Sequence, residues 1–131
     1  MLMPAAVMVV LMLGAIAVDL SIVQLAHRDL VDVAASAAND AAGYGLDPAA
    51  FRQTGAYRID LARAEQAARR SVAAHHLSEQ ITELRVVPGP GVDQITVELA
   101  LPVEHLFAKA IPGADDSTVV TARATATATQ R

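Results

Sequence analysis

The feature that most constrains this chain is one helical pattern that starts apolar, admits a single carboxylate and then continues as an amphipathic helix. From Met1 to Val18 no residue is charged, and Asp19 is followed by a second uncharged run to Ala26. A transmembrane helix needs about 20 mostly apolar residues, whereas the core of a signal peptide needs only about 7–15. We therefore expect a membrane anchor over residues 1–26, with a cleaved signal peptide and a buried core helix as the alternatives.

Asp19 is the first informative residue within this pattern. If the helix enters the bilayer near Pro4, Asp19 lies about 22 Å further along, inside or at the far edge of a hydrocarbon layer about 30 Å thick. A carboxylate at that depth either marks the end of the span or meets a partner from a neighbouring helix, because an unpaired charge in lipid is costly. Both interpretations stay open at this point.

The amphipathic continuation covers residues 27–43, after which Gly43 and Gly45 favour the end of the helix. Its apolar positions recur at steps of three or four and therefore share one face. Many of these side chains are small, so the face suits close packing against another helix or a sheet. We predict that this face, together with the carboxylate, takes part in helix packing between subunits: Asp19, Val23, Ala26, Leu30, Val33, Ala37 and Ala41.

Residues 44–131 are expected to form a small α+β domain. Residues 44–58 have no clear period and predict a loop, and Asp60 is a good N-cap for a helix over residues 61–77. The period then changes to alternation, which predicts three mainly antiparallel strands near residues 80–87, 92–101 and 118–129. The fold class is therefore α+β: a long N-terminal helix, first transmembrane and then amphipathic, followed by a second helix and a small three-stranded sheet.

The C-terminal segment alternates strictly between alanine or valine and threonine or arginine. "VVTARATATAT" places the small apolar residues on one face and the polar residues on the other. This pattern favours a strand that is wet on one side and closely covered on the other. A disordered low-complexity end and a threonine-rich glycosylated stalk are the alternatives, and the strand is better supported.

Composition removes several classes of function. The net charge is −4 and the basic residues are scattered, so the chain lacks the basic footprint of a nucleic-acid-binding protein. It contains no cysteine, which excludes disulfides and zinc-thiolate sites. His75 and His76 are adjacent and cannot share one metal by themselves on a helix, and no phosphate loop or hydrolase motif is present. We expect no catalytic activity, no cofactor and no metal.

The stretch "AIAVDLSIVQLAHRDLVDVAASAANDAAG" resembles the TadE/TadG-like pilin-related proteins of bacterial Tad (Flp) pilus systems. The shared features are the apolar segment followed by Val-Asp, the alanine-rich end of the helix at residues 37–42, and the closing "VTARATATA". The resemblance covers about half of the chain. Prepilins usually also carry a basic leader and a peptidase site before the apolar helix. We see neither in these residues, so processing by a prepilin peptidase stays open.

This resemblance implies a single-pass protein of the cytoplasmic membrane whose C-terminal domain is extracytoplasmic. It would act as a minor pilin or pilus-assembly protein, without catalysis, and would be incorporated in a surface pilus or placed at its base. Its partners would be the lipid bilayer and other pilin-like subunits or Tad assembly components, in a homo- or hetero-oligomer. The alternative is a membrane-tethered extracytoplasmic binding module associated with a secretion system, and a small membrane enzyme is the third hypothesis.

Overall fold

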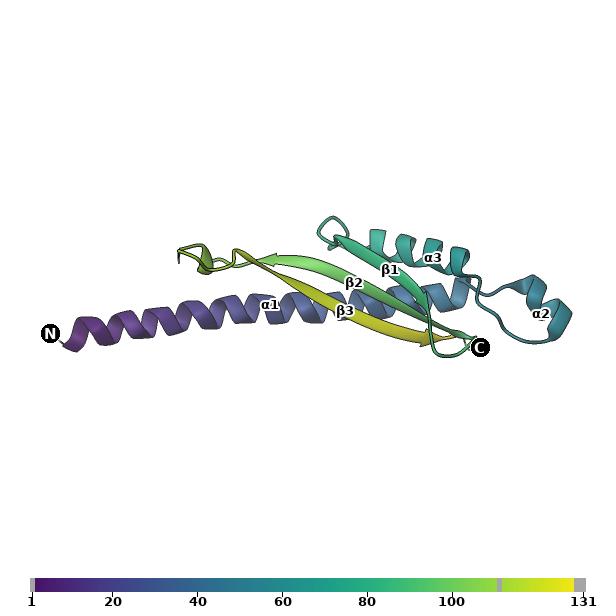
Figure 1. The fold of residues 1–131 in the computed structure, drawn as a ribbon, viewed down its shortest axis with the longest axis horizontal. Coiled ribbons are helices and arrows are strands. Elements are labelled where there is room, and N and C mark those ends of the chain that lie inside the picture. The colour runs from purple at the N-terminus through teal and green to yellow at the C-terminus, as the bar shows by residue number, and fades with distance from the viewer. Residues whose placement is uncertain (1, 111, 129–131) are drawn as a thin grey trace.

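The computed structural model describes residues 2–110 and 112–128, and it confirms the predicted α+β architecture. The long helix α1 runs along the molecule, and its N-terminal half projects beyond all other elements except the connection between β2 and β3 (Figure 1). The elements follow one another as α1 Leu2–Tyr44, α2 Pro48–Thr54, α3 Leu61–Ala73, β1 Glu83–Pro88, β2 Gln94–Glu104, the 3-10 turn η1 Ala108–Ala110 and β3 Ser117–Thr127.

The two halves of α1 have opposite environments. The apolar half is exposed: Met3 is 85% exposed, Val10 is 67% exposed and Leu13 is 62% exposed. The second half is the centre of the core, where Leu30 and Ala37 are both 0% exposed. The buried face is broader than the predicted stripe and also includes Ala34, Ala38 and Ala42. It is broader because both the sheet and α3 pack onto α1, and alanine lets both approach its backbone.

The sheet is an antiparallel meander in the order β1-β2-β3. The alternation predicted for β2 is confirmed, since one face is fully buried: Ile95, Val97, Leu99 and Leu101. Each large residue on this face lies opposite a smaller one on β3, as in the pair Leu99 and Ala122. On the outer face Thr96 and Thr125 share a hydrogen bond of 2.8 Å between their hydroxyls, and Glu98 pairs with Arg123. The predicted wet and covered faces of β3 are therefore present.

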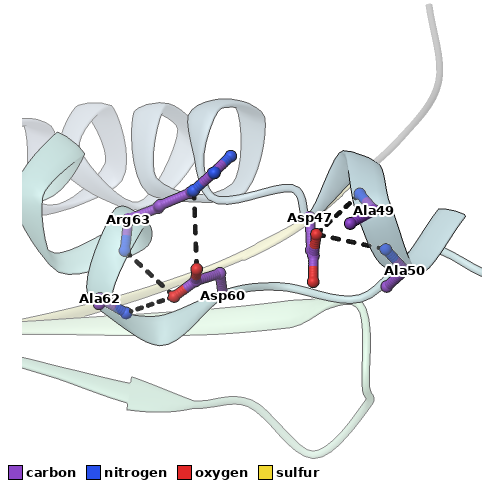
Figure 2. A network of polar contacts seen from close by, with 6 residues as sticks. All are labelled: Asp47, Ala49, Ala50, Asp60, Ala62 and Arg63. Carbon is purple, nitrogen blue, oxygen red and sulfur yellow. Dashed lines mark hydrogen bonds and ion pairs between the residues drawn. The ribbon is translucent and has the colours of Figure 1, made fainter.

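Two aspartates begin the two short helices (Figure 2). Asp60 accepts hydrogen bonds from the backbone N–H groups of Ala62 and Arg63, at 2.9 and 3.4 Å, and so caps α3 as predicted. Asp47 caps α2 in the same way. The prediction of a plain loop over residues 44–58 is therefore wrong, because an N-cap followed by Pro48 in the first turn is sufficient for a seven-residue helix.

Helix α3 and strand β2 end at other residues than predicted. Helix α3 stops at Ala73, and the chain then turns toward β1, although Leu77 remains buried. Strand β2 continues past its predicted end to Glu104, because β3 stays paired with it beyond Glu83, the first residue of β1. Pro102 is tolerated there because it needs no partner for a backbone N–H. Ala100 accepts from Thr82 N on the β1 side, and Pro102 faces the same side, where β1 does not pair with β2. The predicted end of β3 at residue 129 lies outside the described residues.

Candidate functional site around Asp19

Asp19 lies at the end of the exposed half of α1 and is itself 9% exposed. Its sequence neighbours are open, with Val18 at 44% and Leu20 at 65% exposed. A carboxylate that is buried on an otherwise bare helix must be covered by another part of the molecule. The cover is the connection between β2 and β3, after Glu104 and before Ser117. It lies alongside α1, beyond the ends of these two strands (Figure 1).

Strand length brings this connection level with Asp19. Strand β2 has 11 residues and spans about 36 Å at 3.3 Å per residue. The part of α1 from Asp19 to Ala41 spans about 33 Å at 1.5 Å per residue. The sheet packs along this part of the helix, so the end of β2 and the end of the covered helix coincide.

The Asp19 carboxylate accepts hydrogen bonds from three consecutive backbone N–H groups. Its Oδ1 accepts from Leu106 N at 3.0 Å and from Phe107 N at 3.3 Å. Its Oδ2 accepts from Phe107 N at 3.3 Å and from Ala108 N at 3.2 Å. These donors precede and begin η1, where backbone N–H groups have no partner within the turn. Asp19 thus caps η1 from 87–89 residues away in the sequence.

Further polar contacts hold the connection in place above this cap. The backbone N–H of His105 donates to the carbonyl of Asp116 at 3.0 Å, and its Nε2 lies 2.8 Å from the hydroxyl of Thr118. Lys109 Nζ lies 2.8 Å from Glu104 Oε2. This hydrogen bond lowers the pKa of the Glu104 carboxyl and raises the pKa of the Lys109 ammonium. Both side chains are solvent-exposed, so solvent and salt screen the pair.

An apolar groove of about 630 Å³ lies between α1 and the connection. Its floor is the exposed half of α1, and its polar lining residues are Asp19 and His105. The remaining lining is almost entirely hydrocarbon and includes Met8, Leu11, Met12, Ile16, Phe107 and Ala108. Such a surface can accommodate apolar groups.

The residues predicted for packing between subunits divide into three environments. Asp19 is bonded to a connection of its own chain. Val23 and Ala26 are half-buried against the core. The other four are buried in the core of the same molecule: Leu30, Val33, Ala37 and Ala41. Since these four are 0–2% exposed, they have no surface for a second subunit. These four residues pack within their own chain, in the core that the sheet and α3 form with α1.

Sequence reasoning missed the partners of Asp19. Leu106, Phe107 and Ala108 take part through backbone N–H groups, which no motif records, and the contact depends on the lengths of β2 and β3. The available signal for this contact was the apolar pair Leu106 and Phe107, which stands among charged and polar residues in the connection after β2.

Two further observations bear on function. Within residues 2–110 and 112–128, no three His, Asp or Glu side chains gather so that they could hold a metal ion. One helix of this part of the chain, Met3–Tyr44, is long and apolar enough to cross a membrane; the most apolar window within it has a mean hydropathy of 2.5, and none of that window is buried.

No protein-family model, curated protein or solved structure matches this chain.

Proposed function

We propose that this protein is a membrane-anchored minor pilin or pilus-assembly protein of a Tad/Flp-type pilus, with a structural and non-catalytic role. The observation that carries the proposal is the division of α1. One unbroken helix has an exposed apolar half and a second half that is the core of the folded domain. A filament subunit needs this combination, because the same apolar half must dissolve in lipid before assembly and pack against other subunits afterwards.

The residues that carry the family resemblance occupy the matching parts of this architecture. Asp19 stands where the exposed half of α1 meets the domain, and the alanines of residues 37–42 are buried in the half of α1 on which α3 and the sheet pack. The closing alanine–threonine pattern forms β3, whose small side chains face the core. These correspondences support the proposal because they give a structural reason for each motif.

The proposed location is the cytoplasmic membrane, with the domain outside it. The chain has no cysteine, so a single introduced cysteine can be labelled specifically. Thr54 and Val92 are exposed positions on the domain. Cysteines at Thr54 or Val92 should react with an impermeant maleimide on intact cells. Protection of both until lysis would reverse the proposed orientation.

Subunit contacts should use the exposed half of α1, because the buried stripe is already occupied. Val10 is 67% exposed and stands nine residues from Asp19, which places it on the opposite side of the helix at 100° per residue. A photo-crosslinking amino acid at Val10 should yield discrete adducts with pilin-like subunits or assembly components in the native host. The matched control is the same amino acid at Arg52, which is exposed on α2.

The crosslinking result separates the proposal from its alternative. A tethered binding module that never assembles should give lipid adducts at Val10, and its protein adducts should arise from the domain. Protein adducts absent at Val10, together with absence of the chain from sheared surface fractions, would contradict the pilus proposal.

A further inference from the structure

We propose that residues 106–110, in the connection between β2 and β3, form a second membrane-contacting element. This element enters the bilayer beside α1, and lipid hydrocarbon chains fill the apolar groove between the two. The inference rests on the membrane anchorage of the proposed function and is independent of pilus assembly. It assigns a lipid surface to a part of the folded domain rather than to the anchor helix.

The first argument is depth. The exposed apolar part of α1, from Met3 to Leu20, is about 27 Å long at 1.5 Å per residue, close to the thickness of a bilayer's hydrocarbon layer of about 30 Å. Asp19 therefore lies at the edge of that layer when α1 spans it. The groove continues from Asp19 past Met12 to Met8, which is about 10–16 Å further toward the N-terminus. The groove and the connection above it thus overlap the hydrocarbon layer in depth.

The second argument is the chemistry of the connection. Leu106 is 65% exposed and Phe107 is 47% exposed. Phe107 lines the groove beside the exposed half of α1, and the backbone N–H of Leu106 donates to Asp19 in that helix. A backbone at membrane depth must have its N–H groups paired, because no water is present to receive them. The Asp19 carboxylate supplies the acceptors for three such groups in succession. The same contacts give Asp19 partners, which a carboxylate at this depth requires.

The third argument is the placement of the nearby charges. Lys109 is paired with Glu104 at the end of β2, and both side chains are exposed. A lysine stem can lie along apolar surface while its ammonium reaches the headgroup layer. Neither Lys109 nor Glu104 lines the groove, whereas Phe107, Ala108 and Ala110 of the connection do. Lipid is the fitting occupant because the floor of the groove is the same helix surface that lipid would surround.

The test uses tryptophan as a depth probe, since the chain contains none. Three single-tryptophan variants of the full chain are reconstituted in phosphatidylcholine nanodiscs whose lipids carry bromine at defined acyl-chain depths. Phe107→Trp reports the connection, Leu11→Trp reports the span, and Val92→Trp reports the far end of the domain, where Val92 is 79% exposed. We expect a blue-shifted emission and a loss of fluorescence for Phe107→Trp, strongest with bromine near the headgroup end of the chain.

The controls separate the failure of this inference from the failure of the proposed anchorage. Quenching of Leu11→Trp, with Phe107→Trp as unquenched as Val92→Trp, would overturn the lipid contact while leaving the anchor intact. An unquenched Leu11→Trp would overturn the anchor. Quenching of Phe107→Trp that declines as the number of chains per nanodisc rises would assign the groove to a second subunit and overturn the assignment to lipid.

Discussion

Replacing Asp19 by alanine should release the connection between β2 and β3 and leave the rest of the domain folded. The substitution removes the acceptor of three backbone N–H groups. A buried donor left without a partner costs about 1–3 kcal/mol. Because Leu106 is 65% exposed, we take the lower end of this range, about 1 kcal/mol for each N–H, or about 3 kcal/mol in total. This corresponds to a factor of about 100 in the local opening equilibrium.

Hydrogen exchange of the full chain in nanodiscs measures this opening directly. The amides of Leu106, Phe107 and Ala108 should exchange about 100-fold faster in Asp19→Ala than in the parent. Asp19→Asn should have a smaller effect, because the amide oxygen can still accept some of these bonds. The matched control is Asp32→Ala, which removes an exposed carboxylate from the same helix and should leave these amides unchanged.

Two results would refute the reasoning. Unchanged exchange at residues 106–108 in Asp19→Ala would mean that the carboxylate does not hold the connection. Faster exchange at the centre of β2, for example at Val97, would mean that Asp19 supports the whole sheet rather than one turn. Either result would also remove the structural basis for placing the connection at membrane depth.

The remaining predictions concern the core, the end of α1 and the exposed ion pair. Leu30→Ala should lower the free energy of unfolding by about 2–5 kcal/mol, measured by denaturant titration in detergent, because Leu30 is 0% exposed. Gly45→Ala should destabilise the domain by about 1–3 kcal/mol in the same assay, because its Cβ would lie 2.4 Å from a backbone oxygen of α1. Gly43→Ala should be neutral or stabilising by up to about 1 kcal/mol, since a Cβ at Gly43 meets nothing within 4 Å. The Glu104 carboxyl should titrate below its ordinary pKa of 4.5 by NMR, and Lys109→Gln should abolish that depression.

The sign of the pH effect follows from the direction of the Glu104 shift. The carboxyl has a lower pKa in the folded chain than in the unfolded chain, so the ion pair contributes above the unfolded value and its contribution is lost as pH falls through the folded value. A Glu104 titration that is the same in the parent and in Lys109→Gln would contradict the pairing. Equal stabilities of the Gly43→Ala and Gly45→Ala variants would contradict the close approach at the end of α1.

Periodic features of the sequence were sufficient for most of the fold. The long helix was predicted as an anchor over residues 1–26 with a continuation over residues 27–43, and it is observed at Leu2–Tyr44, because its pattern persists for many turns. The buried face of β2 followed from strict alternation. Element ends were less predictable, since β2 ends opposite the first residue of β3 and α3 stops where the chain must turn toward the sheet. The short helix α2 was missed because only one cap distinguishes seven helical residues from a loop.

The candidate site could be predicted only in part. The cost of a carboxylate at membrane depth indicated that Asp19 needs a partner, and the sequence left the identity of that partner open. The partner is a set of backbone N–H groups, which every non-proline residue possesses and which therefore leaves no mark in a sequence. Likewise, the apolar stripe of α1 was recognisable, but whether it packs on its own sheet or on another subunit depends on tertiary structure.

The absence of a break in α1 has a mechanical consequence. The 43 residues of this helix span about 65 Å, and the sheet and α3 are packed directly onto its second half, so no linker separates the anchor from the domain. With the first half in a bilayer, an average helix tilt of about 20° displaces the far end sideways by about 22 Å. The domain and the first half of α1 therefore move as one rigid body. A lateral pull on the domain is transmitted to the anchor as torque, and any change in tilt within the membrane swings the domain through a wide arc.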